Sequence, residues 1–367
     1  MRLKFLGQNI HRITLESTDL CNLDCRFCFL KKSRKINSHH NNKYNHLSYR
    51  LFEKLIKQLS KFDNYQKIAV NLSGGEPFLN PRIFKMLEFS RDYGIRLIIF
   101  TNGTCLNKKQ IFRILDNQVS SLMFSVDGSL GEHDANRGKG NFNKTIETIK
   151  VLRNAKKTLT LDTPKITVNT VINKLNLGSF DEMVYLAKEI GSNMINFSLV
   201  QWSDDYIIDK SIEELSARFG NCYKATGMIK SINHGLGKLT QKEIKKVIDK
   251  INFIKNNLSS FSPLNISFFP DFSTKEEFKK WFSTGCYKID YCSNIFEQIR
   301  IDCHGNVFSG CSIPFYKLGN IKNEQLSDVL NSRRARKLNL SIKKNGFFYI
   351  CQRCCRRPSN SKILKKQ

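Results

Sequence analysis

Hydrophobic and polar positions in the first 200 residues follow two alternating patterns. Short, largely apolar runs with high β-propensity predict strands at residues 10–15, 68–72, 95–100, 122–126, 166–172 and 194–200. Between the strands, apolar residues recur at helical spacing and predict helices at residues 49–59, 81–93, 108–115, 142–152 and 180–190. Pro81 at the start of one helix and Gly94 and Gly191 after two others are typical of helix ends.

This alternation of strands and helices predicts an α/β fold in which a parallel sheet is covered by helices. Six such units favour a barrel or partial barrel, with the functional site at the carboxyl ends of the strands. Residues 203–284 are polar and Lys-rich, with helical periodicity at residues 244–254, and we expect a helical insertion there. Residues 285–367 are rich in Cys, Gly and Arg and predict a small metal-stabilised domain. The expected domains are therefore 1–202, 203–284 and 285–367.

Composition narrows the class of protein. The chain has 367 residues, 40% of them hydrophobic and 25% charged, as in globular proteins. Its 60 Lys and Arg against 32 Asp and Glu give a net charge of +28, but the basic residues are spread along the chain, so we do not expect a nucleic-acid partner. No stretch resembles a signal peptide or the roughly 20 apolar residues of a membrane span. The sequence predicts a soluble, cytoplasmic protein without a membrane partner.

Twelve cysteines in a reducing compartment are better interpreted as metal ligands or reactive thiols than as disulfides. Cys21, Cys25 and Cys28 form a C-x3-C-x2-C pattern directly after the first predicted strand. Three thiolates leave one coordination position open, which favours a [4Fe-4S] cluster whose fourth iron binds a ligand. The alternative is a zinc site that takes its fourth ligand from His39, His40 or His46.

Polar motifs also follow the next predicted strands. Gly74, Gly75, Glu76 and Pro77 follow the second strand, where the glycines permit close backbone approach and the glutamate can accept a hydrogen bond from a cation. The later candidates, which are also residue types found in ordinary turns, are Asn102, Ser125, Asp127 and Arg137. Their recurrence at successive strand ends favours a rim that faces a ligand.

The cysteine pattern, with Phe27 before its last cysteine, resembles the signature of the radical S-adenosylmethionine (SAM) enzymes. The resemblance spans residues 10–199 and implies the partial (β/α)6 barrel of that family. It implies that Cys21, Cys25 and Cys28 hold a [4Fe-4S] cluster whose unique iron binds SAM. Reductive cleavage of SAM there gives a 5′-deoxyadenosyl radical that abstracts hydrogen from a substrate.

The same resemblance implies roles for the rim residues. Residues 74–77 resemble the GGEP motif, which binds the amino group of SAM. Ser125 and Asp127 would lie near the SAM ribose or carboxylate, and Arg137 would pair with the carboxylate. Asn169, in the fifth strand, is a candidate for the adenosine side. The sequence selects no general acid or base.

The last quarter of the chain resembles a SPASM or twitch extension, which binds auxiliary iron–sulfur clusters. The expected ligands of one auxiliary cluster are Cys292, Cys311, Cys351 and Cys354. The remaining cysteines there, which would serve as substitutes or as ligands of a second cluster, are Cys286, Cys303 and Cys355. Structural zinc is the alternative for this set.

The architecture favours an oxidoreductase or maturase that modifies a peptide or protein, with a small molecule as the other class of substrate. It would take electrons from a reductase or from a flavodoxin- or ferredoxin-type donor. Because the cysteine loop begins only twenty residues into the chain, no N-terminal peptide-binding module is seen. An enzyme that removes tetrapyrrole carbons is therefore the first alternative. The second is a basic, metal-stabilised nucleic-acid-binding protein, which would have no reason to carry residues 74–77.

Overall fold

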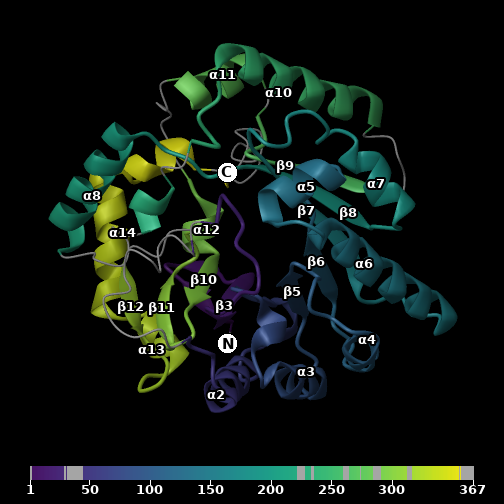
Figure 1. The fold of residues 1–367 in the computed structure, drawn as a ribbon. Coiled ribbons are helices and arrows are strands. Elements are labelled where there is room, and N and C mark those ends of the chain that lie inside the picture. Colours follow the sequence, from purple (N-terminus) through teal and green to yellow (C-terminus); the bar gives the residue numbers. More distant parts are fainter. Residues whose placement is uncertain are drawn as a thin grey trace.

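The computed structural model of the chain describes residues 2–28, 30, 44–220, 228–232, 235–258, 264–272, 274–283, 291–311, 316–354 and 356. Its centre is a ten-stranded sheet in the spatial order β12-β11-β10-β3-β4-β5-β6-β7-β8-β9 (Figure 1). The strands of this sheet are β3 (Arg12–Thr18), β4 (Ala69–Gly74), β5 (Leu97–Thr101), β6 (Ser121–Ser125), β7 (Lys165–Ile172), β8 (Met194–Leu199), β9 (Asn265–Phe269), β10 (Gln298–Ile301), β11 (Asn306–Ser309) and β12 (Lys317–Asn320). A hairpin of β1 (Lys4–Phe5) and β2 (Gln8–Asn9) precedes it.

The six predicted strands are confirmed as β3 to β8, which lie side by side and pair in parallel. The sheet is open at both ends and does not close into a barrel. The predicted helices are confirmed between the strands and lie outside the sheet in Figure 1. These helices are α2 (Tyr49–Leu59), α3 (Ile83–Asp92), α4 (Lys108–Asp116), α6 (Asn141–Thr158) and α7 (Met183–Glu189).

The sheet extends beyond the six strands on both sides. β9, from the stretch expected as an insertion, pairs in parallel with β8. On the other side, β10 pairs in parallel with β3, and β11 and β12 continue the sheet antiparallel. Segments from the last quarter of the chain therefore lie beside its first long strand, as Figure 1 shows. The other helices of this half are α8 (Asp205–Phe219), α10 (Gln241–Phe253), α11 (Lys275–Ser283), α12 (Ser293–Phe296), α13 (Leu326–Leu330) and α14 (Arg333–Asn345).

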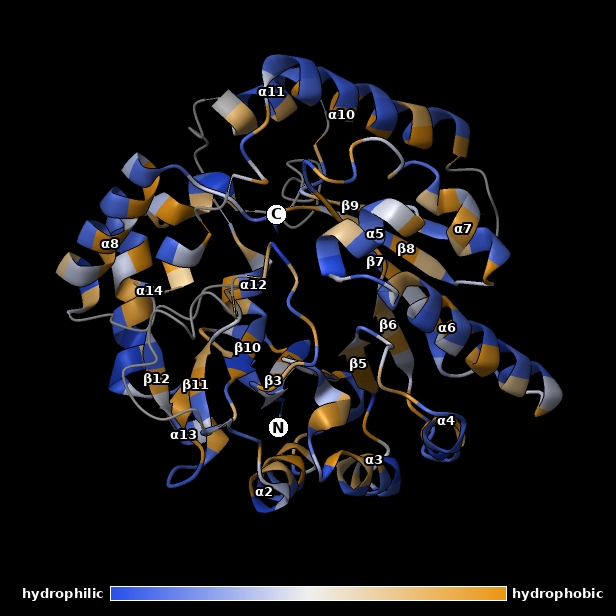
Figure 2. Cartoon of the chain, viewed as in Figure 1, coloured by the Kyte–Doolittle hydropathy of each residue, from blue (hydrophilic) through white to orange (hydrophobic). Residues whose placement is uncertain are grey.

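The two faces of the sheet differ in polarity because successive side chains alternate between them. In β3, Ile13 and Leu15 are buried in the hydrophobic core with the apolar residues of α2. Arg12, Thr14 and Glu16 lie on the opposite face, which we call the inner face, together with the residues in register with them. In Figure 2, helices α2 and α10 carry both hydrophobic and hydrophilic residues, whereas strand β5 is mainly hydrophobic.

One helix near the strand ends was not predicted from the sequence. Helix α5 (Leu130–Arg137) has few apolar residues, and its fold is fixed by contacts to the next helix. The Asp134 carboxylate accepts hydrogen bonds from the backbone of Gly140 at 2.5 Å and Phe142 at 2.9 Å, which are donors at the start of α6. This arrangement sets the position of Arg137, the last residue of α5.

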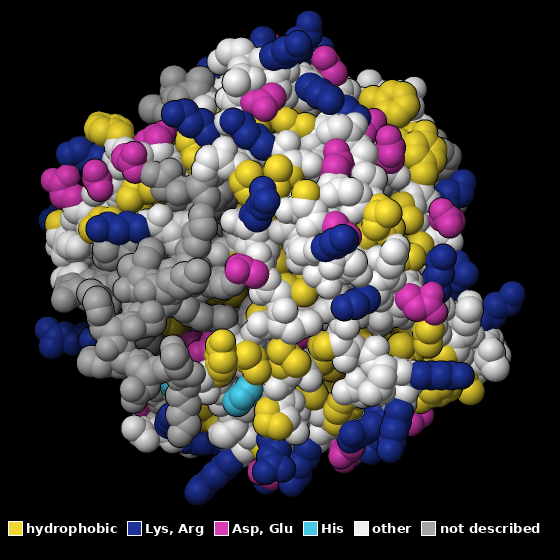
Figure 3. All heavy atoms as spheres, viewed as in Figure 1, with side chains coloured by type: hydrophobic (Ala, Val, Ile, Leu, Met, Phe, Trp, Pro, Cys, Tyr) yellow, Lys and Arg dark blue, Asp and Glu magenta, His cyan; other side chains and the backbone are white. Residues whose placement is uncertain are grey.

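The visible surface carries side chains of both charges. Figure 3 shows Lys and Arg side chains scattered over the visible face, with acidic side chains among them. Within the part of the chain that the structure describes, no helix is long and apolar enough to cross a membrane.

Candidate cluster and cofactor site

The cysteine loop lies at the carboxyl end of β3. Cys21, Cys25 and Cys28 are all half-buried, and none of them forms a disulfide. Burial raises the pKa of the Cys25 thiol to about 11; the charge of Arg137 opposes this rise, and those of Cys28 and Cys21 add to it. The three thiols are therefore near enough to interact electrostatically, as ligands of a common cluster must be.

Gly74 and Gly75 hold the chain that leads into this loop. The Gly75 backbone N–H donates to the Thr18 carbonyl at 2.7 Å, and the Glu76 N–H donates to the Leu20 carbonyl at 2.8 Å. A Cβ atom on Gly75 would lie 2.0 Å from the Leu20 oxygen. Gly74 has a φ of 111°, and a Cβ there would lie 2.4 Å from the Thr18 oxygen. Both positions therefore require glycine, because the two segments approach too closely for a side chain.

The Glu76 carboxylate joins the ends of β4 and β5. It is buried, and it accepts hydrogen bonds from Thr101 Oγ1 at 2.9 Å, the Asn102 backbone N–H at 2.8 Å and the Phe78 N–H at 3.3 Å. Burial raises the pKa of Glu76 to about 7, against the lowering effect of these hydrogen bonds. Thr101 was not assigned a role from the sequence, although it stands at a strand end directly before Asn102. Pro77 follows as the first residue of a short 3₁₀ turn.

Asn102 faces the cysteine loop, as expected for a rim residue. Its side-chain Nδ2 donates to Asn22 Oδ1 at 2.9 Å and lies 4.0 Å from the Cys21 sulfur. Its Oδ1 accepts from the backbone and the hydroxyl of Thr104 at 2.8 and 2.7 Å. The side chain is thus held in one orientation beside Cys21.

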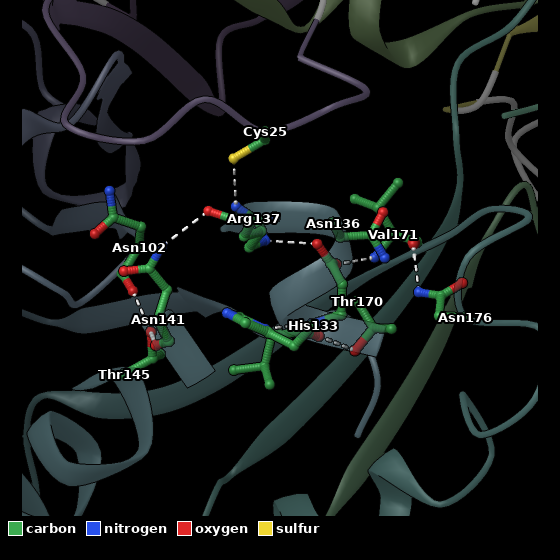
Figure 4. Close-up of polar contacts among 12 residues, drawn as sticks. Cys25, Asn102, His133, Asn136, Arg137, Asn141, Thr145, Thr170, Val171 and Asn176 are labelled. Atoms are coloured by element: carbon green, nitrogen blue, oxygen red, sulfur yellow. Dashed lines mark hydrogen bonds and ion pairs between the residues drawn. The ribbon is translucent and has the colours of Figure 1, made fainter. Parts of the chain in front are cut away.

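Arg137 connects the opposite rim to the cysteine loop (Figure 4). Its Nη1 lies 3.6 Å from the Cys25 sulfur, and its Nε lies 2.5 Å from Asp127 Oδ2. The guanidinium carbon lies 5.3 Å from the centroid of the Phe27 ring. Burial alone would lower the pKa of Arg137, but Asp127 and Cys25 outweigh it and raise the pKa. A permanent positive charge therefore lies at the cluster site.

Asp127 is fully buried and engaged within the protein. Besides Arg137, its carboxylate accepts from the Val171 backbone N–H at 2.7 Å. Its own N–H donates to His133 Nδ1 at 3.2 Å, and burial lowers the pKa of that histidine to about 4. These contacts give Asp127 the role of orienting Arg137.

The remaining candidates on this side lie on the inner face. Ser125, at the end of β6, is half-buried and lies in register with Asn169 of β7. The Oδ1 of Asn169 accepts a hydrogen bond from Asn196 Nδ2 at 2.9 Å. The structure therefore brings both residues to the same part of the inner face.

Of the three histidines that were considered as zinc ligands, the structure describes His46. His46 Nδ1 lies 2.8 Å from the Thr18 hydroxyl, so this ring is part of the contacts that hold the end of β3. His39 and His40 lie outside the described residues.

Cys105 was not assigned a role from the sequence, but it lies near the site. Burial raises the pKa of Cys105 to about 12, and the charges of Glu76 and Cys21 add to this effect.

The four expected auxiliary ligands also come together. Burial raises the pKa of Cys351 well above its usual value, and the charges of Cys311, Cys354 and Cys292 all add to this rise. Cys292 is the residue before α12, and Cys311 follows β11. Gly310 permits this approach, since a Cβ there would lie 2.3 Å from the Asn294 carbonyl oxygen.

Of the remaining cysteines of the last quarter, the structure describes Cys303, which lies in a different environment. Cys303 is buried, and burial raises the pKa of its thiol to about 12. The charges of Asp302, Glu16 and Asp19 add to this rise. Cys286 and Cys355 lie outside the described residues.

Arg353 ties the auxiliary cysteines to the rest of the chain. Arg353 lies between Cys351 and Cys354 in the sequence, and its side chain is buried. Its Nη1 donates to the Trp281 carbonyl, and its Nη2 lies 3.6 Å from Asp204 Oδ2. Its guanidinium also lies 5.2 Å from the centroid of the Trp202 ring. The auxiliary set is thus anchored to Asp204, the N-cap of α8, and to Trp281 of α11.

Both cysteine sets fit iron–sulfur clusters chemically. Soft thiolates are the usual ligands of such clusters, and each set groups three or four of them. The described residues contain no three His, Cys, Asp or Glu side chains that converge on a single metal ion. In a [4Fe-4S] cluster each cysteine binds a different iron, so its ligands do not need to converge on one point.

Comparison with known proteins agrees with this geometry. The Radical SAM superfamily model matches residues 15–187, and the SPASM iron–sulfur cluster-binding domain model matches residues 292–355. An AdoMet-dependent heme synthase of Methanosarcina barkeri is 37% identical over 33% of this chain and 33% of its own length. The mycofactocin maturase MftC of Mycobacterium ulcerans is 27% identical over 50% of this chain and 45% of its own length. The chain thus spans a third to about half of these curated relatives.

A solved structure shares the fold over the whole chain. Streptococcus suis SuiB bound to S-adenosylmethionine aligns with a TM-score of 0.64 and 14% identity, covering 100% of this chain and 76% of SuiB. SuiB has also been solved with its precursor peptide SuiA. Together, the matched models, the motifs and the fold identify residues 15–187 as a radical SAM superfamily domain and residues 292–355 as a SPASM iron–sulfur cluster-binding domain.

Proposed function

We propose that the chain is a radical SAM enzyme that modifies a peptide or protein. The observation that carries this proposal is the contact between two motifs: Gly75 and Glu76 bind the backbone that leads into the cysteine loop through two hydrogen bonds. This contact holds a strand-end carboxylate and three thiols at one edge of the sheet, where α/β proteins bind ligands.

In this proposal Cys21, Cys25 and Cys28 hold the reactive [4Fe-4S] cluster and residues 74–77 orient SAM. When bound, the cluster and SAM supply the one-electron chemistry that generates a carbon radical. The protein's residues provide position and charge. Arg137 keeps a positive charge beside Cys25, which stabilises the thiolate over the thiol, and Asp127 keeps that arginine in place.

The auxiliary cysteines Cys292, Cys311, Cys351 and Cys354 would hold a second cluster. Burial raises the pKa of Cys292 to about 12 and the pKa of Cys351 well above its usual value, so cluster assembly would release the protons of these two thiols. We place the enzyme in the cytoplasm, because none of the described cysteines forms a disulfide and both clusters require reducing conditions. A flavodoxin, ferredoxin or reductase would supply the electron.

The preference for a peptide or protein substrate draws on two proteins with related architecture. MftC is a maturase, and SuiB has been solved with a precursor peptide. A specific observation also favours a second candidate: the heme synthase of M. barkeri has 37% identity to the stretch it matches. Tetrapyrrole modification is therefore the alternative substrate class.

The proposal is tested first by iron, sulfide and zinc content after anaerobic reconstitution, with the EPR spectrum of the reduced protein. Two [4Fe-4S] clusters correspond to about eight irons per chain, and added SAM should perturb one of the two signals. Stoichiometric zinc with little iron would contradict the assignment.

Cys25→Ala should then abolish production of 5′-deoxyadenosine, whereas the control Cys105→Ala should retain it. Mass spectrometry of a candidate peptide encoded by a neighbouring gene, compared with a propionate-bearing tetrapyrrole, separates the two substrate classes.

A further inference from the structure

The charged residues of the inner face are not all paired. Glu16 and Arg300 neutralise each other across β3 and β10, with Arg300 Nε 2.9 Å from Glu16 Oε1. Arg12 lies on the same face of β3, four residues earlier, in register with Gln298 of β10 and Ala69 of β4. Its Nε is buried and has no hydrogen-bonding partner.

The charges around Arg12 are positive. Burial lowers its pKa, and the two charged groups that add to this effect are Arg356 and Arg96. No carboxylate of the described residues forms an ion pair with Arg12. Arg12 is half-buried, and its buried Nε is a donor without a partner beside two cations, so an anion bound there would satisfy this donor and offset the positive charge.

Hydrogen bonds fix Arg356 in relation to this strand. The Asn294 side-chain Nδ2 donates to the Arg356 carbonyl at 3.2 Å, and Gln298 Nε2 donates to Asn294 Oδ1 at 2.8 Å. The Arg356 guanidinium lies over the Phe269 ring, 5.6 Å from its centroid. The Arg356 backbone is thus linked through Asn294 to Gln298, the residue of β10 in register with Arg12, which brings the SPASM end of the chain to the start of β3.

We propose that Arg12 and Arg356 form a binding site for a carboxylate group of the substrate, on the inner face at the amino end of β3. The inference rests on the proposed function for the reaction that the bound substrate undergoes. Binding of the carboxylate itself does not depend on the proposed function. A guanidinium matches a planar carboxylate with two parallel hydrogen bonds, which favours a carboxylate over a neutral amide.

The position of this site specifies the geometry of the substrate. A strand rises roughly 3.3 Å per residue, so Arg12 lies about 20 Å along β3 from Thr18, where the cysteine loop begins. An extended peptide covers that distance in about six residues. The substrate would thus carry an acidic group several residues from its reacting carbon, with the acidic group bound at Arg12.

The test measures binding of glutarate to the full-length protein without SAM, by saturation-transfer NMR. Glutarate should bind to the wild type and to the control Arg91→Gln, an exposed arginine paired with Asp92. Affinity should fall about tenfold in Arg12→Gln, as expected for the loss of about 1.4 kcal/mol, and less in Arg12→Lys, which keeps the charge. Glutaramide, the neutral analogue, should not bind.

Equal glutarate binding by the wild type and Arg12→Gln would overturn the site. Tighter binding of inorganic phosphate than of glutarate would overturn the assignment to a carboxylate. If Arg12→Gln does not fold, Arg356→Gln provides the second test, with the same expected direction and the same contradiction. Because SAM is absent, a negative result leaves the SAM-cleavage proposal, tested through Cys25, unaffected.

Discussion

The guanidinium of Arg137 lies 3.6 Å from the sulfur of Cys25, although 112 positions separate the two residues in sequence. The contact depends on Asp127, which holds the other side of the guanidinium. The segments that follow β3 and β6 are thus connected through one buried side chain. This connection makes the charge of Arg137 part of the environment of the cysteine loop.

Replacement of Arg137 should therefore lower both the free energy of unfolding and the iron content of the protein. Arg137→Met leaves the Asp127 carboxylate buried without its counter-charge, which costs on the order of 3–5 kcal/mol. Arg137→Lys keeps the charge but not both contacts, so its loss should be smaller. Denaturant unfolding and iron content check this result. An Arg137→Met protein as stable as the wild type would show that Asp127 does not need this partner.

Gly75→Ala should disrupt the cysteine loop more than the fold. The new Cβ would lie 2.0 Å from the Leu20 oxygen, and backbone must move to relieve this overlap. We expect loss of SAM cleavage with a nearly unchanged circular dichroism spectrum. The control is Gly131→Ala in α5, where the added carbon would have no atom within 4 Å apart from its chain neighbours and the backbone of its own helix. Similar activity in both variants would contradict the role of the close contact.

Glu76 should make stability depend on pH. Its pKa rises from 4.5 to about 7 in the folded protein, so between these values the folded protein keeps a proton that the unfolded chain has released. Stability should therefore fall as pH rises through this range, by roughly 3 kcal/mol in total, and then level off. Thermal unfolding of the metal-free protein from pH 4 to pH 8 measures this slope.

The slope attributed to Glu76 has its own control. Glu76→Gln cannot titrate and should lose this part of the pH dependence. Glu88→Gln, which removes a half-exposed partner of Arg113, should retain it. Identical pH profiles for the wild type and Glu76→Gln would show that the buried carboxylate is ionised throughout the range.

Removal of Cys351 and Cys354 should lower the iron content by one cluster and leave the other. The double alanine variant is expected to retain about four of about eight irons and to keep the SAM-sensitive EPR signal. Cys303→Ala is the matched control, because Cys303 lies apart from the auxiliary set near Glu16. Unchanged iron in the double variant would show that other cysteines bind the auxiliary cluster.

Local patterns were sufficient to predict the centre of the fold. Strands β3 to β8 coincide with short apolar runs, and α2 has apolar residues at helical spacing over Tyr49–Leu59. Helix α5 was missed because its stability comes from Asp134 and not from an apolar face. The pairing of β10 with β3 was also missed, since register between strands so far apart in sequence leaves no local signal.

The candidate site, like the fold, was predicted from the sequence only in part. The positions of the cysteines and of Gly74 to Pro77 followed from motif spacing and the ends of the predicted strands. The partners of these residues did not: the hydrogen bond from Thr101 to Glu76 and the contacts of Arg353 depend on tertiary packing. The unpaired Arg12 is likewise visible only once the neighbouring strands are in register.

The pairing of β10 with β3 has a consequence for biosynthesis. β4 covers one edge of β3 early, but its other edge has no partner until Gln298–Ile301 has emerged from the ribosome. An open strand edge is prone to associate with other chains. Until β10 pairs with it, the edge of β3 that leads to the cysteine loop therefore stays open to association with other chains.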